Sequence, residues 1–185
     1  SELEDAERRI ERLIRELRKA NEEVARRIEK SNEDSRRVNK KVAEEIERLI
    51  KELRDVTKDV DDKETVKRIV DEMLERVKKL ITEVKEISDR DLEESRKLIR
   101  EVEKISEDVL DTVRKLVEDV RRKTRDKRVE EELKRVLDEV KRVIEESKER
   151  LKKWLRDSER VVEESRRHLE ELRKRVEKAV REIRT

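Results

Sequence analysis

The sequence predicts an all-α protein of three long straight helices in an up-down-up bundle, with consecutive helices antiparallel. Three observations predict it. The 185 residues include no glycine or proline and are 58% charged, as in long helices. The apolar residues recur with a helical period, and the phase of that period breaks only twice. Strand-rich folds are excluded in practice, since Trp154 is the only aromatic residue.

The first helix is predicted over residues 2–59. From Ala6 onward its apolar residues are spaced by 4, 3, 4, 3 and 4 residues, and this set of five steps repeats. Eighteen residues then make five turns, or 3.6 residues per turn, which is the pitch of a straight helix; a strict heptad would give a left-handed supercoil. Ser1 and Glu4 fit a capping box at its start.

The second helix is predicted over residues 62–123, because the apolar phase breaks between Val60 and Val66. Asp61 and Glu64 fit a capping box within that break. Each predicted helix is about 58 residues, or about 87 Å at 1.5 Å per residue.

The third helix is predicted over residues 126–184, after a phase break between Val120 and Val129. Asp126 is its expected N-cap. Residues 1–185 are therefore expected to form a single elongated domain. A rival interpretation places turns near residues 33, 89 and 158 as well, giving six helices of about 30 residues. The apolar phase continues through all three places, which favours three helices.

Polar residues other than Asp, Glu, Lys and Arg are rare, so their positions are informative. If the first and third helices are parallel and offset by 126, three asparagines lie level with three serines, and Asp91 lies level with Ser31 and Ser158. We predict a buried polar network at these positions: Asn21, Ser31, Asn32, Ser35, Asn39, Ser88, Asp91, Ser95, Ser147, Ser158 and Ser165.

The network has a physical rationale. A buried unpaired hydroxyl or amide costs about 1–3 kcal/mol. Matched polar layers therefore weaken a core but penalise every register that unpairs them. The isolated residues Ser106, Thr112 and Thr57 are instead expected at the wet edge of the bundle.

The sequence favours no catalytic or cofactor chemistry. His168 is the only histidine and there is no cysteine, so neither a histidine-based nor a thiolate metal site is expected. We expect His168 to be packed or half-exposed at the edge of the apolar stripe, and Trp154 to fill core space. We therefore expect that the protein is not an enzyme and binds no cofactor, metal or small-molecule substrate.

Charge and hydropathy limit the partners. The 55 basic and 53 acidic residues are interleaved, with a net charge of +2, which argues against a nucleic-acid partner. No apolar run approaches the 18 residues of a membrane span, and no targeting signal is expected. Localisation is undetermined.

The chain resembles de novo designed helical bundles of the parametric kind, with buried hydrogen-bond networks. The resemblance covers the whole chain. It rests on the 18-residue period, the charged surface, the matched polar layers and a repeated unit in which Ile10–Arg18 recurs as Ile46–Arg54. Such designs usually carry glycine or proline in their loops, and this chain has neither, which leaves the exact loop positions open.

The resemblance implies a stable structural scaffold with no evolved activity. Two alternatives stay open. The chain could be one component of a designed assembly, either self-associating or accepting a partner helix along the edge that carries the asparagines. It could also be an amphipathic coiled-coil or lipid-surface protein, although acidic and basic residues are mixed on its polar face and aromatic anchors are missing.

Overall fold

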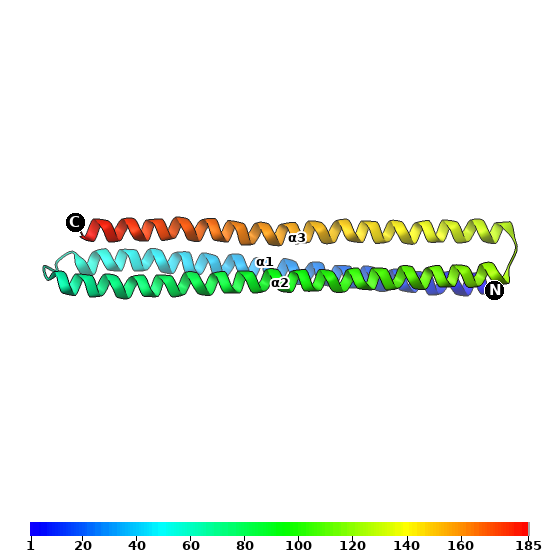
Figure 1. The fold of residues 1–185 in the computed structure, drawn as a ribbon, viewed down its shortest axis with the longest axis horizontal. Coiled ribbons are helices and arrows are strands. Elements are labelled where there is room, and N and C mark those ends of the chain that lie inside the picture. The colour runs from blue at the N-terminus through cyan, green and yellow to red at the C-terminus, as the bar shows by residue number, and fades with distance from the viewer. Residues whose placement is uncertain (185) are drawn as a thin grey trace. The chain divides into compact units, whose positions relative to one another are not determined.

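A computed structural model describes residues 1–184 and contains three helices with two short connections (Figure 1). The helices are α1 (Glu2–Thr57), α2 (Lys63–Lys123) and α3 (Lys127–Arg184). Each helix continues without interruption through its central polar cluster. The prediction of three helices is thus confirmed, and the six-helix interpretation is wrong. A polar residue on the buried face alters packing but leaves the helical backbone hydrogen bonds intact.

The chain divides into two compact units, each built from a part of all three helices. Unit 1 comprises residues 1–29 and 94–157, and unit 2 comprises residues 30–93 and 158 onward. The N-terminus lies beside the α2–α3 connection in unit 1, and α3 ends beside the α1–α2 connection in unit 2 (Figure 1). Each unit is described separately below, and the single elongated domain stays a prediction.

The helix starts follow capping chemistry, with one correction. The backbone N–H of Glu4 donates to Ser1 Oγ at 3.3 Å, and that of Arg128 donates to Asp126 Oδ1 at 3.0 Å, as expected. At α2, however, the cap is Asp62 rather than Asp61. Its carboxylate accepts from the backbone N–H of Glu64 at 3.2 Å, and helix geometry begins one residue later than predicted.

The connections work without glycine because they never need it. No described residue has a positive φ angle, so none occupies the left-handed region that favours glycine. The N–H of Thr124 donates to the Val120 carbonyl at 3.0 Å, and that of Val60 donates to the Thr57 carbonyl at 3.3 Å. These bonds satisfy terminal carbonyls of α2 and α1.

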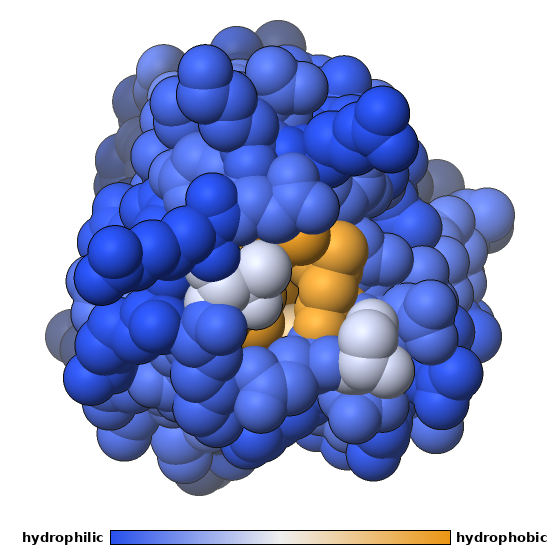
Figure 2. All heavy atoms as spheres, turned by 90° about the vertical axis from the view of Figure 1, so that its right-hand side faces the viewer, coloured by the Kyte–Doolittle hydropathy of each residue, from blue (hydrophilic) through white to orange (hydrophobic). Residues whose placement is uncertain are grey.

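Unit 1 has a hydrophobic core to which all three helices contribute. Ile28 of α1, Val113 of α2 and Leu151 of α3 are at most 1% exposed within it. Figure 2 shows the end of the molecule at the α2–α3 connection, where apolar residues lie at the centre and hydrophilic residues surround them.

Unit 2 has its own core, which includes Ile46, Val70 and Ala179, each fully buried. Along α1, the core of unit 1 ends at Ile28 and that of unit 2 begins at Ala43. Between those positions Ser31 and Ser35 stand where the apolar spacing expects apolar residues, whereas Val38 and Val42 are partly buried and pack against the core of unit 2.

Candidate functional site

Three asparagine–serine hydrogen bonds join α1 to α3. In each, the serine hydroxyl donates to the asparagine Oδ1, and the two residues are 126 apart in sequence. The parallel offset expected from the sequence is therefore found in both units. The pairs are Asn21–Ser147 in unit 1 (3.1 Å), and Asn32–Ser158 (3.1 Å) and Asn39–Ser165 (3.3 Å) in unit 2.

The Asn21–Ser147 pair is the most deeply buried of the three. Both residues are 5% exposed. Each fills a core position of its helix, since Leu17 and Val24 flank Asn21 by one turn, and Val143 and Leu151 flank Ser147. A polar group in such surroundings must be hydrogen-bonded to avoid a desolvation cost of about 1–3 kcal/mol.

Asp91 joins α2 to α1 within unit 2. Its carboxylate accepts a hydrogen bond of 2.8 Å from Ser35 Oγ. Ser35 is 8% exposed, and Asp91 is half-buried. The sequence pattern had placed Asp91 level with Ser31, so its observed partner lies one helical turn further along α1. The expected register between α1 and α2 is corrected by that turn.

The other predicted network residues have no place in these four bonds. Ser88 and Ser95 of α2 are buried, at 6% and 2% exposure, and Ser31 is half-buried. The structure thus contains hydrogen-bonded pairs at the predicted positions, whereas a continuous network through all eleven residues stays a prediction.

Two residues assigned to the wet edge are buried instead. Ser106 is 2% exposed, and its hydroxyl has no hydrogen-bond partner within the described chain. Thr57 is 9% exposed, and its hydroxyl donates to the Leu53 carbonyl of its own helix at 2.6 Å. Ser106 continues the apolar spacing of Val102 and Val109, a signal that could have identified it as a core residue. Thr112 is half-buried.

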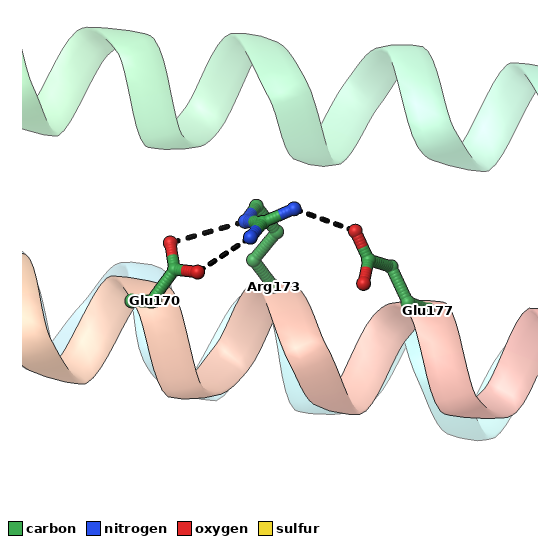
Figure 3. A network of polar contacts seen from close by, with 3 residues as sticks. All are labelled: Glu170, Arg173 and Glu177. Carbon is green, nitrogen blue, oxygen red and sulfur yellow. Dashed lines mark hydrogen bonds and ion pairs between the residues drawn. The ribbon is translucent and has the colours of Figure 1, made fainter.

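The helix surfaces carry ion pairs, of which one cluster on α3 involves three residues (Figure 3). The Arg173 guanidinium donates to Glu170 at 2.5 and 3.1 Å and to Glu177 at 2.6 Å. The hydrogen bonds from Arg173 lower the pKa of Glu170, and the bonded carboxylate raises the pKa of Arg173. These groups are solvated, so the cluster contributes little to stability.

One acidic contact was not anticipated from the sequence. Burial raises the pKa of Glu7 on α1, and the nearby Glu132 carboxylate on α3 raises it further. The Arg135 guanidinium bonds Glu132 and holds the pKa of that carboxyl below its usual range. Both carboxyls belong to unit 1 and are half-buried. The 126 offset would have revealed them, since Glu7 lies level with the residue after Glu132.

Two shallow cavities flank Asn21 in unit 1. One, of about 290 Å³, is lined by Leu17, Asn21, Val143 and Ser147 among others. The other, of about 480 Å³, includes Asn21 and Trp154. Trp154 is half-buried and packs against the unit 1 core, in agreement with the expected role as a core filler.

The remaining polar residues offer little chemistry. His168 is solvent-exposed on α3, rather than packed as one expectation had it. Over residues 1–184, no group of three or more His, Asp or Glu side chains is arranged to hold a metal ion. In the same described range, every helix is too polar to cross a membrane.

Comparison with known proteins supports the fold. The chain is similar to a solved structure described as a computationally designed three helix bundle, with a TM-score of 0.73 and 19% identity. The match covers 98% of this chain and 90% of the other. At this identity the likeness establishes the three-helix-bundle fold alone. No protein-family model and no curated protein matches the sequence.

Proposed function

We propose that this chain is a structural scaffold of designed type, whose buried polar pairs set the register of its helices and which has no chemistry of its own. The observation that carries the proposal is the constant offset of 126 between the members of all three Asn–Ser pairs. The fold shared with a computationally designed three helix bundle supports it, as does a composition without glycine, proline or cysteine.

The repeated apolar pattern creates the problem that the pairs address. The 18-residue period and the recurrence of Ile10–Arg18 at Ile46–Arg54 offer similar apolar surfaces in more than one alignment. A helix moved along its neighbour by one or more turns would still bury much the same apolar area. Apolar contact is non-directional, so it discriminates poorly between these alignments.

The polar pairs remove that ambiguity through their spacing. The three asparagines of α1 are separated by 11 and then 7 residues, and the three serines of α3 have the same spacings. Because 7, 11 and their total of 18 all differ, any shifted alignment matches at most one asparagine with a serine. At least two pairs are then broken, each at about 1–3 kcal/mol for a buried unsatisfied group.

The short connections already limit large shifts within one chain, since α1 and α2 are separated by residues 58–62 and α2 and α3 by residues 124–126. The pairs therefore act on shifts of a single turn, and on contacts between separate chains where no connection sets the alignment. Both effects favour one well-defined monomer.

The experiment compares the parent with a variant in which all three asparagines become leucine and their three serines become alanine. The chain has no native cysteine, so Glu22→Cys and Lys148→Cys on the exposed surface of unit 1 provide two spin labels. The α1–α3 alignment is read from the distance distribution between the labels, and molar mass is read from light scattering.

The expected parent result is one narrow distance and a mass near 22.6 kDa. The variant should resist denaturant better, because apolar replacements of buried polar pairs are often stabilising. It should also show a broadened distance distribution, because each turn of slippage moves one label about 5.4 Å along the helix axis relative to the other, or it should show a larger mass. A variant as uniform and monomeric as the parent would refute the register role, and an oligomeric parent would favour the assembly alternative.

A further inference from the structure

We propose that Ser106 and Ser88 of α2 each join one of these Asn–Ser pairs. Each pair then becomes a hydrogen-bonded ring of one asparagine and two serines, with one residue from each helix. This inference rests on the proposed register function and assigns it two further residues. Ser106 belongs to unit 1 with Asn21 and Ser147, and Ser88 belongs to unit 2 with Asn39 and Ser165.

The alignment of α2 in unit 1 is given by two ion pairs. When two residues on antiparallel helices lie at the same height, their residue numbers add up to the same total all along the helix pair. Lys123 Nζ lies 3.5 Å from the Glu2 carboxylate, which gives a total of 125 for α1 and α2. Arg121 Nε lies 2.8 Å from the Glu130 carboxylate, which gives 251 for α2 and α3.

Ser106 lies level with the buried pair by this measure. The numbers of Ser106 and Asn21 total 127, and those of Ser106 and Ser147 total 253. Each total is two residues from the value set by the ion pairs, which is about 3 Å along a helix axis. The residues one turn on either side of all three belong to the same core cluster. The three polar side chains therefore occupy one level of one core.

Unit 2 repeats the arrangement independently. Its Ser35–Asp91 hydrogen bond gives a total of 126 for α1 and α2. Ser88 and Asn39 total 127, and Ser88 and Ser165 total 253, the same values as in unit 1. Ser88 is 6% exposed and Ser165 is 5% exposed.

The donors and acceptors of such a ring balance. Ser147 already donates to Asn21 Oδ1. The Asn21 side-chain N–H can donate to Ser106 Oγ, and the Ser106 hydroxyl can donate to Ser147 Oγ, so that each residue donates once and accepts once. The structure contains the first of these three bonds, and the Ser106 hydroxyl has no hydrogen-bond partner within the described chain. Closing the ring requires rotation of the Ser106 hydroxymethyl group about the Cα–Cβ bond.

The unpaired hydroxyl makes the proposal easy to test, because the two interpretations predict opposite signs. If Ser106 closes the ring, Ser106→Ala lowers the folded-to-unfolded ratio by about fivefold or more. If its hydroxyl is simply buried and unpaired, the same substitution raises that ratio.

A double-mutant cycle completes the test. Guanidinium chloride unfolding would be measured for Ser106→Ala, Asn21→Ala and the double variant. We expect a coupling of about fivefold or more in the unfolding constant, and additivity within about twofold for the matched control of Ser106→Ala with Asn39→Ala in the other unit. Ser88→Ala with Asn39→Ala should repeat the coupling.

Stabilisation by Ser106→Ala, or additivity with Asn21→Ala, would overturn the ring. A parallel cycle of Asn21→Ala with Ser147→Ala separates that failure from failure of the proposed function. If this second cycle remains coupled, the Asn–Ser pair stands and only the third member is lost. If it too is additive, the register function fails with the ring.

Discussion

Replacing Ser147 by alanine tests how strongly one buried polar pair depends on both of its partners. The substitution removes the hydroxyl that donates to Asn21 Oδ1 at 3.1 Å and leaves the amide in place at 5% exposure. The lost hydrogen bond contributes about 0.5–1.5 kcal/mol, and an unsatisfied buried acceptor raises the cost to about 1–3 kcal/mol. The cavity of about 290 Å³ beside Asn21 gives the amide access to water, so we expect about 1–1.5 kcal/mol.

The informative comparison is with the double variant Asn21→Leu, Ser147→Ala. Removing both polar groups leaves nothing unsatisfied and adds apolar area, so its free energy of unfolding should equal or exceed that of the parent. The assay is guanidinium chloride unfolding followed by circular dichroism at 222 nm, with the denaturant dependence m required to stay constant across variants.

Two results of this assay would contradict the expected role of the pair. If Ser147→Ala changes stability by less than about 0.3 kcal/mol, water satisfies Asn21 fully and the pair carries no cost when broken. If the double variant is less stable than Ser147→Ala alone, leucine does not fit the site, and the pair was retained for shape. Ser165→Ala is the internal control. The Ser165–Asn39 hydrogen bond is longer, at 3.3 Å, and only part-buried, so this substitution should lower the free energy of unfolding by less.

Three further predictions concern groups outside the asparagine pairs. Ser35→Ala should lower the free energy of unfolding by about 1.5 kcal/mol, because it removes a charge-assisted hydrogen bond of 2.8 Å. Asp91→Asn keeps an acceptor and should cost less. Equal losses in denaturant unfolding would show that the charge is irrelevant. Glu7→Gln should raise stability at pH 7 by a few tenths of a kcal/mol. Burial and the Glu132 carboxylate raise the pKa of Glu7 in the folded state, so its ionised form opposes folding above its unfolded pKa. The gain in stability should vanish as pH falls through the folded pKa and the native carboxyl protonates. A gain that persists at acid pH in thermal unfolding would contradict this cause. Arg173→Ala should change stability only slightly, as expected of a solvated ion pair (Figure 3). The loss should shrink between low and 1 M salt as screening increases; a salt-independent loss would indicate lost packing instead.

The sequence alone determined that there are three helices and placed their ends to within two residues, since α1 ends at Thr57 rather than at residue 59, and α2 and α3 each begin one residue later than predicted. The chain consists of helix-forming residues without glycine or proline, and its apolar period of 3.6 breaks only at the two connections. Both features indicate three continuous helices, because helix propensity and apolar spacing act locally along the chain. The same phase places Asn21, Asn32 and Asn39 level with their serines. Equal spacing along two parallel helices survives any small error in the length of the connections.

Only the tertiary structure decided what depends on how the connections bring the helices together. An antiparallel register shifts with every residue in a connection, and this is why Asp91 bonds Ser35 where Ser31 is expected. The cap of α2 falls on Asp62, one residue later than expected. Phase along one helix gives the direction in which a side chain points, whereas its height against a neighbour is set by packing between helices.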